Sequence, residues 1–332
     1  MGIKVAIMGA TGAVGTELLD ILAERKFPIS DLRLLASARS AGKTLKFQDD
    51  AIQVQELKHD SFNGIDLVLA SAGGKLSKEY APSAVKAGAI VVDNTSYFRM
   101  TEGVPLVIPE INPEDLAQHK GIIANPNCST IIMALALWPL HKRFKAVRVV
   151  ATTYQAASGA GAVAMDELVR ETAAYLQGED FRRTVIPHPY AFNLFPHNSP
   201  MTDTGYCEEE IKMVKETHKI FHDPSIRITA TCVRVPVLRA HSEALNIEFA
   251  EDPSVDEIYA ILNKAAGVEV MEDRGANRWA MPLDASGRDP VLVGRVRKDL
   301  SQPKTVDIWV VGDQIRKGAA LNAVQIAETL FK

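Results

Sequence analysis

The sequence has few cysteines, and their small number limits the kinds of site that it can form. Only three occur in 332 residues, Cys128, Cys207 and Cys232, and they are widely separated. They are too few and too scattered for a disulfide framework or for a zinc site built from cysteine. This usage favours a reducing compartment, so we expect the protein in the cytoplasm.

Long hydrophobic runs and net positive charge are also lacking. No apolar run approaches the roughly 20 residues that cross a bilayer. The start, MGIKVAIMGA, has one lysine before a very short apolar stretch, which fits a first β-strand better than a signal peptide. The formal net charge of −4 gives no basic field for nucleic acid, so an anionic substrate must be held by a local cluster of cations. We expect neither a membrane nor a nucleic acid as a partner.

The remaining composition is that of a globular protein, with 47% apolar and 23% charged residues, and the length suits two domains. Before residue 127, short apolar runs alternate with segments of helical spacing. Continuously apolar strands that alternate with helices predict a parallel sheet covered on both faces. The apolar runs are 4–8, 32–37, 66–71 and 89–94, and the helical segments are 14–25 and 77–88.

The pattern changes after residue 127, where β-branched runs suit a half-exposed sheet. Prolines make residues 187–200 a loop, and the charges of 207–217 indicate an exposed helix. The predicted strands are 146–158, 226–237, 243–250 and 305–311, and the predicted helices are 129–137 and the tail 315–332. We place the second domain at about 128–313, with the tail helix returning to the first.

Two histidines four residues apart resemble zinc ligands on a helix. However, Lys219 stands between His218 and His222 where a metalloprotease has its glutamate, and Asp223-Pro224 ends the segment at once. We interpret both as surface histidines at a helix end and expect no metal site.

The stretch GATGAVG places Gly9, Gly12 and Gly15 directly between the first strand and the first helix. Glycine there permits a tight turn and a close approach of the backbone to a pyrophosphate, whose charge the helix N-terminus stabilises. The spacing is GxxGxxG rather than GxGxxG, but its context is that of a dinucleotide site. A close-packed turn without a ligand is the alternative.

The end of the second strand distinguishes between the two nicotinamide cofactors. An NAD site usually has an acidic residue there, which binds the ribose hydroxyls. The stretch LLASARSAGK instead offers Ser37, Arg39, Ser40 and Lys43, which suit a 2′-phosphate. NADP is therefore favoured, with a solvated basic loop as the alternative.

Cys128 lies in the stretch NPNCST, between an Asn-Pro-Asn turn and a predicted helix. A thiolate is the reactive form of cysteine, and its pKa falls at a helix N-terminus because unpaired N–H groups there favour anions. The same groups could hold an oxyanion after the sulfur has attacked a carbonyl. An isolated cysteine is more often a buried hydrophobe, but its position after a nucleotide-binding domain favours a nucleophile.

A histidine near two arginines is the candidate partner of this thiol. His241 follows Arg234 and Arg239 in RVPVLRAHSE, near the end of a predicted strand. Imidazole can take a proton from the thiol and later exchange one with the substrate oxygen. Arginine can hold a carboxylate with two hydrogen bonds. A structural histidine is the alternative.

Five ordered motifs together resemble the aspartate-semialdehyde dehydrogenases of the bacterial type, over essentially the whole chain. They are GATGAVG, NPNCST, TYQAASGAG, RVPVLRAHSE and DQIRKGAALNAVQIAE. The resemblance implies a Rossmann-type NADP-binding domain (1–127 and 314–332), an α+β catalytic and dimerisation domain with a mixed sheet (128–313), and a homodimer. It implies the reversible conversion of L-aspartyl-4-phosphate and NADPH into L-aspartate 4-semialdehyde, NADP and phosphate, a step in the biosynthesis of lysine, threonine and methionine.

The resemblance also implies roles for particular residues. Cys128 is expected to be the nucleophile that forms an acyl-thioester, His241 the acid/base, and Gln155 a residue that positions the substrate. Arg234 is similar to the family's substrate-carboxylate arginine, so we prefer it to Arg239. The phosphate site is expected to include Arg99, Lys212 and Asn127. The implied NADP contacts are Gly9, Thr11, Gly12, Ala13, Val14, Gly15, Ser37, Arg39, Ser40, Ala41, Ser158, Gly159 and Gln314.

Glu209 is the candidate for binding the substrate amino group. Because residues 208–210 are all glutamate, the sequence leaves open which of the three binds it.

Two other functions remain open. N-acetyl-γ-glutamyl-phosphate reductase applies the same cysteine chemistry to a longer, acylated substrate, but that family usually has a glycine where this chain has Asn127. The other is a relative without activity that serves as a binding or scaffold protein. Such a relative would be expected to lack the nucleophile, whereas Cys128 and its candidate partners are present.

Overall fold

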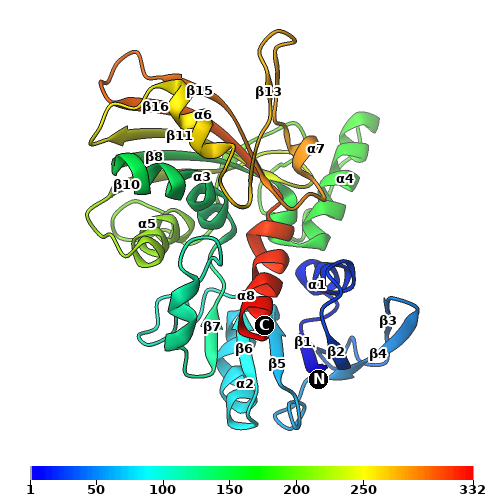
Figure 1. The fold of residues 1–332 in the computed structure, drawn as a ribbon. Helices are drawn as coiled ribbons and strands as arrows, with labels where there is room; N and C mark the ends of the chain where they lie inside the picture. The colour runs from blue at the N-terminus through cyan, green and yellow to red at the C-terminus, as the bar shows by residue number, and fades with distance from the viewer. Residues whose placement is uncertain (1, 332) are drawn as a thin grey trace. The chain divides into compact units, whose positions relative to one another are not determined.

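Strand β1 lies in the middle of a seven-stranded sheet in the first part of the chain. The computed structural model describes residues 2–331 and divides into two units, one of residues 1–127 and 319–332 and one of residues 128–318. The sheet of the first unit has the order β3-β4-β2-β1-β5-β6-β7 and is parallel except for the pair β3–β4 (Figure 1). Its strands are β1 (Ile3–Met8), β2 (Ile29–Ala36), β3 (Thr44–Phe47), β4 (Asp50–Glu56), β5 (Leu67–Ala70), β6 (Ile90–Asp93) and β7 (Ile122–Ala124).

Helices cover both faces of this sheet. On one face, α1 (Ala13–Glu24) and α8 (Leu321–Phe331) pack in the same apolar cluster as Val5 and Ile7 of β1. On the other, α2 (Gly74–Lys86) packs with the alternate residues of β1. The strand order from β4 to β7 is that of a doubly wound nucleotide-binding sheet. The predicted Rossmann-type fold is confirmed.

The second unit contains a mixed sheet of the order β12-β15-β16-β11-β8-β10-β9. The pairs β8–β10 and β12–β15 are parallel and the others antiparallel. The predicted mixed sheet is therefore confirmed. Its strands are β8 (Ala146–Gln155), β9 (Phe195–Pro196), β10 (Arg227–Arg234), β11 (His241–Phe249), β12 (Val268–Val270), β15 (Val291–Lys298) and β16 (Thr305–Gly312).

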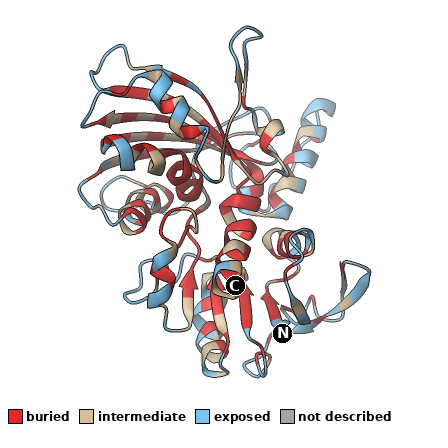
Figure 2. Cartoon of the chain, in the orientation of Figure 1, coloured by how far each residue is buried: buried red, intermediate tan, exposed pale blue. Residues whose placement is uncertain are grey.

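Helices α3 (Cys128–Phe144), α5 (Glu208–Phe221) and α6 (Val255–Leu262) pack on this sheet. Buried and half-buried residues alternate along the strands of this sheet (Figure 2). In β8, Thr153 and Gln155 are buried and Tyr154 between them is only half-buried. The smaller elements are α4 (Ala162–Gln177), α7 (Pro282–Ala285), the 3₁₀ segments η1 (Pro113–Gln118) and η2 (Ala157–Ala160), and the hairpin of β13 (Glu272–Asp273) and β14 (Arg278–Trp279). Within residues 2–331, no helix is long and apolar enough to cross a membrane.

Two expectations need correction, and several strands were not predicted. Residues 187–200 are not entirely a loop, because Phe195–Pro196 pairs with the end of β10 as an edge strand, where proline is tolerated. Helix α5 is not simply exposed, because it packs on β10 and buries a face that includes Met213 and Glu216. Strand β15 was not predicted, since a glycine and three basic residues interrupt its apolar pattern.

The C-terminal helix begins later than predicted. A π-helical turn, Arg316–Ala320, precedes α8, and residue 332 lies outside the described residues. Residues 314–318, which we expected in the first domain, group with the second unit. The Asp313 carboxylate accepts hydrogen bonds from the backbone N–H groups of Ile315 and Arg316, which holds this segment beside the end of β16.

Candidate active site

In the glycine loop of the first unit, backbone atoms of neighbouring residues lie very close together. Gly9 has a φ of 91°, in the region that favours glycine. A Cβ at Gly15 would lie 2.2 Å from the Gly9 carbonyl oxygen, whereas one at Gly12 would lie 3.4 Å from the same atom. In the described chain, the first turn of α1 carries neither a side-chain cap nor an acidic residue. Its N–H groups and its dipole therefore suit an anion.

The predicted 2′-phosphate residues follow β2, the neighbour of β1 in the sheet. Ser37 to Ala41 form a turn in which the N–H groups of Ser40 and Ala41 both donate to the Ser37 carbonyl. Arg39 is exposed and Ser40 is buried. Because parallel strands end at one edge of a sheet, this turn and the glycine loop share the edge at which such sheets bind ligands.

Arg99 and Asn127 also belong to the first unit, and both are buried. The Arg99 guanidinium donates from Nε to the Asn125 carbonyl (2.9 Å) and from Nη2 to the Asn94 carbonyl (2.8 Å). Asn125 is tied to α8, since its Oδ1 accepts from Asn322 (2.7 Å). Arg99 is thus fixed beside the Asn-Pro-Asn turn that contains Asn127.

The three cysteines differ in their surroundings. Cys128 is the first residue of α3 and is half-buried, whereas Cys207 and Cys232 are buried, and none of them forms a disulfide. Burial raises the pKa of the Cys232 thiol. A Cβ on Gly318 would come within 2.9 Å of the Cys128 Cβ, so the glycine leaves room for the thiol. Only Cys128 combines access with a helix N-terminus.

Gln155, at the end of β8, connects this helix to α5. Its Nε2 donates to Ser129 Oγ (2.9 Å) and to Glu209 Oε1 (3.2 Å). The other oxygen of Glu209 pairs with Lys212 Nζ (3.2 Å). Glu208 is exposed, and the Glu210 carboxylate binds the backbone N–H groups of Cys207 and Cys232. Of the three glutamates, Glu209 is the one whose carboxylate accepts a hydrogen bond from Gln155, and its role toward the substrate stays a prediction.

Arg234 and His241 meet just beyond Gln155. Arg234 ends β10 opposite Gln155 in the parallel pair, and its Nη1 donates to the Ala156 carbonyl (3.1 Å). A Cβ at Gly159 would lie 2.8 Å from Arg234 Nη1 and 3.1 Å from His241 Nε2. The guanidinium and the imidazole therefore border the same small space at η2, which a larger residue at position 159 would fill.

The hydrogen bonds of His241 indicate which ring nitrogen carries its proton. Nδ1 accepts the backbone N–H of Ala156 (3.0 Å), and the buried Nε2 has no hydrogen-bond partner among the described residues. Burial, together with the charge of Arg234, lowers the pKa of His241 to about 3. The ring is therefore neutral near pH 7, with its proton on Nε2, and it acts as a donor in this state.

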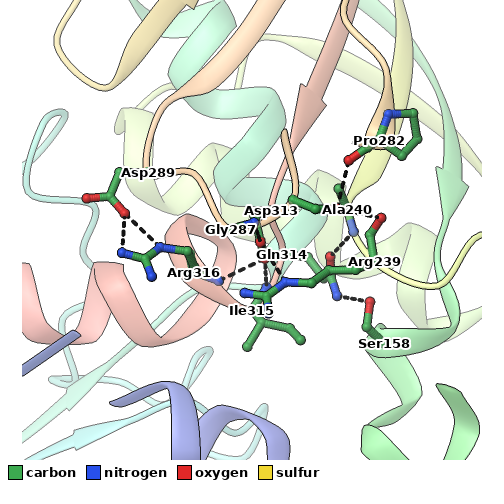
Figure 3. A network of polar contacts seen from close by, with 11 residues as sticks. Ser158, Arg239, Ala240, Pro282, Gly287, Asp289, Asp313, Gln314, Ile315 and Arg316 are labelled. Carbon is green, nitrogen blue, oxygen red and sulfur yellow. Dashed lines mark hydrogen bonds and ion pairs between the residues drawn. The ribbon is translucent and has the colours of Figure 1, made fainter. Parts of the chain in front are cut away.

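Arg239 belongs to a polar network around Asp313 and Gln314 (Figure 3). Its Nε donates to the Asp313 carboxylate (2.7 Å), which also accepts the Gly287 N–H (2.6 Å). Gln314 follows Asp313, accepts the Ala240 N–H (2.9 Å) and donates to Ser158 Oγ. This network pairs Arg239 with a carboxylate of the protein and connects two predicted cofactor residues, Ser158 and Gln314, to the residue before His241.

Two polar residues of the second unit were missed from the sequence. Asp313 precedes Gln314 and fixes its segment, and His197 lies 2.9 Å from Arg234. No periodicity distinguishes either one, and only the proline-rich setting of His197 indicated an unusual loop. Within residues 2–331, no cluster of three His, Cys, Asp or Glu side chains could hold a metal.

Comparison with known proteins places both units in one family. The sequence model of the semialdehyde dehydrogenase NAD binding domain matches residues 4–119, and that of the semialdehyde dehydrogenase dimerisation domain matches residues 137–317. An aspartate-semialdehyde dehydrogenase of Synechocystis is 59% identical over 330 residues, which are 99% of this chain and 98% of the relative.

Two solved structures extend the comparison to the fold. The aspartate semialdehyde dehydrogenase II of Vibrio cholerae, complexed with ASA, has a TM-score of 0.96 at 45% identity. The match covers 100% of this chain and 98% of the Vibrio cholerae chain. The aspartate semialdehyde dehydrogenase of Candida albicans with NADP has a TM-score of 0.76 at 25% identity. The match covers 100% of this chain and 99% of the Candida albicans chain.

Proposed function

The chain belongs to the semialdehyde dehydrogenase family, and we propose that it converts L-aspartyl-4-phosphate and NADPH reversibly into L-aspartate 4-semialdehyde, NADP and phosphate. The observation that carries the proposal is the arrangement at the end of β8. There Gln155 contacts the first turn of the helix that begins with Cys128, while the next residue, Ala156, binds both Arg234 and His241. The proposed carboxylate-binding cation, the proposed hydrogen-bond donor and the helix that begins with the proposed nucleophile are thus all bonded to one strand end.

The first unit fits NADP. The glycine loop joins β1 to the uncapped N-terminus of α1, which suits a pyrophosphate, and the lack of room for a Cβ at Gly15 shows how closely the loop packs on the start of this helix. The exposed Arg39 and the hydroxyls of Ser37 and Ser40 suit a 2′-phosphate. The neighbour from Candida albicans contains NADP. The assignment of Ser158, Gly159 and Gln314 to the same cofactor rests on the sequence resemblance and stays a prediction.

Cys128 begins the reaction in this proposal. The N-terminus of α3 favours the thiolate, whose sulfur attacks the acyl carbon of aspartyl phosphate. An S–C bond forms, the C–O bond to phosphate breaks, and a thioester remains on the enzyme. Lys212, Arg99 and Asn127 are the proposed phosphate residues, since cations make phosphate a better leaving group.

NADPH, when bound, supplies a hydride to the thioester carbon. The oxygen then becomes an oxyanion, to which the Nε2–H of His241 donates a hydrogen bond. Collapse of the oxyanion expels the Cys128 sulfur and releases the aldehyde. No proton transfer to His241 is required in this step. For His241 to act as a base, the bond between Nδ1 and the Ala156 N–H would have to be released first.

Arg234 and Glu209 are the proposed ligands of the substrate's amino-acid group. Arg234 offers a guanidinium with a buried Nε that has no hydrogen-bond partner among the described residues, and Glu209 is fixed by Gln155. We also infer that two copies pair through the second unit, because the dimerisation-domain match falls there. The cytoplasm is the proposed compartment, and lysine, threonine and methionine biosynthesis the proposed pathway.

The test is an assay of the purified protein with NADP, phosphate and one aldehyde at a time. We expect NADPH to form with aspartate semialdehyde and not with N-acetylglutamate semialdehyde. Turnover only with the N-acetylated aldehyde would replace this proposal with N-acetyl-γ-glutamyl-phosphate reductase. Absence of turnover with either aldehyde would favour a binding protein without activity.

A further inference from the structure

Glu243 carries a buried carboxyl group that the proposed mechanism does not use. It lies two residues after His241 on β11, and its side chain is fully buried (0% exposed). Neither of its carboxyl oxygens has a hydrogen-bond partner among the described residues. Burial raises the pKa of this carboxyl well above its usual value. The group is therefore neutral near pH 7 and carries a proton that it can donate.

The strand register places Glu243 on the same face of the sheet as Gln155. Thr153 lies opposite Glu243 in the antiparallel pair of β8 and β11, and directly paired residues point to the same face. Gln155 is two residues further along β8 and shares this face, which α3 covers. Residues on one face of a strand are about 7 Å apart, and paired residues about 5 Å. Three polar side chains thus form a compact buried group between the sheet and α3.

This group contains several hydrogen-bonding atoms that the protein itself does not satisfy. The amide nitrogen of Gln155 donates to Ser129 and Glu209, but its oxygen Oε1 is buried and has no partner within residues 2–331. The hydroxyl of Thr153 lies near the Cys232 thiol, yet it forms no hydrogen bond of regular geometry in the described chain. Buried polar atoms of this kind cost free energy, and an internal water molecule commonly satisfies several of them at once.

The donors and acceptors of the group match those of a water molecule. The acid O–H of Glu243 can donate to the water oxygen, and Oε1 of Gln155 can accept a hydrogen bond from it. The Thr153 hydroxyl offers a third bond, and three hydrogen bonds are typical of a buried water. An ion would find no opposite charge here, because the Glu243 carboxyl is neutral and the amide and hydroxyl are uncharged.

We propose that a buried water molecule bridges the protonated carboxyl of Glu243 and Oε1 of Gln155, which makes Glu243 a positioning residue for this glutamine. The water holds Oε1 as an acceptor, while Nε2 on the other side of the amide donates to Ser129 and Glu209. The amide plane is then fixed from both sides. The effect on activity rests on the proposed function, in which Gln155 positions the substrate, whereas the water site itself does not.

Two substitutions at Glu243 separate hydrogen bonding from packing. Glu243→Leu removes the donor and both acceptors, whereas Glu243→Gln keeps a neutral group with one acceptor oxygen and an N–H donor. We expect kcat/KM for aspartate semialdehyde to fall by about 10-fold in the leucine variant, the effect of one lost hydrogen bond, and by much less in the glutamine variant. The thermal unfolding midpoint of Glu243→Leu should change little, because leucine needs no hydrogen-bond partner in a core.

Leu245→Met is the matched control, since Leu245 is the next buried residue on the same face of β11 and the exchange nearly conserves volume. It should leave kcat/KM unchanged. A wild-type kcat/KM in Glu243→Leu would overturn the positioning role of Glu243. Equal losses in Glu243→Leu and Glu243→Gln would assign the effect to packing and would overturn it as well.

Two measurements on the full-length protein test the water site without any assay of activity. A high-resolution crystal structure should show one ordered water within hydrogen-bond distance of the Glu243 carboxyl and of Gln155 Oε1, and the same position should hold no water in Glu243→Leu. The infrared difference spectrum between the wild type and Glu243→Gln at pH 7 should contain the C=O band of a protonated carboxylic acid.

A carboxylate band in that spectrum, or a crystal structure in which Glu243 bonds directly to another protein group, would contradict the proposal. Failure of the wild-type protein to oxidise aspartate semialdehyde would refute the proposed function and, with it, the effect of Glu243 on activity. The crystal structure and the infrared spectrum would still decide whether the water site exists, so the two failures are distinguishable.

Discussion

The two units present their functional groups in different ways. In the first unit the proposed NADP site consists mainly of backbone, in two short segments that each follow a strand of one parallel sheet. In the second unit the proposed site consists of side chains from helices α3 and α5 and strands β8, β10 and β11. The first arrangement is fixed by local geometry, and the second depends on contacts between residues far apart in the chain. Substitutions in the two units should therefore fail in different ways.

The largest effect is expected from Cys128→Ala, which removes the proposed nucleophile. Turnover should fall by about 10⁴-fold or more, whereas NADP binding should persist because the glycine loop belongs to the other unit. Steady-state kinetics and fluorescence titration with NADPH measure the two effects. Cys232→Ala is the control, and it should alter stability rather than turnover because Cys232 is buried. Appreciable activity in Cys128→Ala would show that this thiol is not the nucleophile.

A methyl group in the glycine loop should affect the cofactor and the fold together. Gly15→Ala would place a Cβ within 2.2 Å of a backbone oxygen, which cannot move away without distorting the loop. We expect a loss of about 3 kcal/mol or more in unfolding free energy and weak NADPH binding, because backbone overlap exceeds ordinary overpacking.

Gly12→Ala is the matched variant, because its Cβ would lie 3.4 Å from the same oxygen. It should cost much less stability, as measured by urea unfolding. Equal losses of unfolding free energy in the two variants would show that the distance from the added Cβ to the Gly9 carbonyl oxygen does not determine the cost.

Gly159→Ala probes the second unit by the same means, but here the added methyl meets side chains rather than backbone. It would lie 2.8 Å from Arg234 Nη1 and 3.1 Å from His241 Nε2. We expect kcat/KM to fall by about 10- to 100-fold, because small displacements of reacting groups are costly, with little change in thermal stability. A large loss of stability with normal kcat/KM in the remaining folded protein would show that these two side chains do not act on the substrate.

The smallest effect is expected from Arg39→Glu, on an exposed side chain of the first unit. The KM for NADPH should rise by about 10-fold and that for NADH should change little, since only NADPH carries the 2′-phosphate that the new carboxylate would repel. Kinetics with both cofactors give the ratio directly. An equal change for both would show that Arg39 does not contact the 2′-phosphate.

The sequence was sufficient for the neighbouring strands β1, β2, β5 and β6 of the first unit, because each contains an apolar run that ends in small or polar residues. It missed β7 and the mostly exposed strands β3 and β4. It was less informative for the second unit. Strand β15 contains Gly294 and three basic residues, and β9 contains a proline, so neither has a strand pattern that can be recognised alone. Both are specified by their partners in the sheet.

The same distinction holds for the candidate site. Cys128 and His241 could be proposed from their neighbours in the chain, since a helix start and an Arg-rich strand end are local features. The contact of Glu209 with Gln155, 54 residues away, and the position of His197, which follows from the pairing of β9 with β10, could not be proposed in this way. These contacts come from tertiary packing, which spacing along the chain does not encode.

The central claim, that Cys128 carries the acyl group, is tested most directly by trapping that group. The protein would be incubated with aspartate semialdehyde and NADP without phosphate, quenched in acid, digested and analysed by mass spectrometry. In the absence of phosphate the thioester should accumulate, with formation of NADPH in proportion. We predict an aspartyl group on the peptide that contains Cys128 and none on the peptides of Cys207 and Cys232. An acyl group on another residue, or NADPH formed without any adduct, would contradict the account.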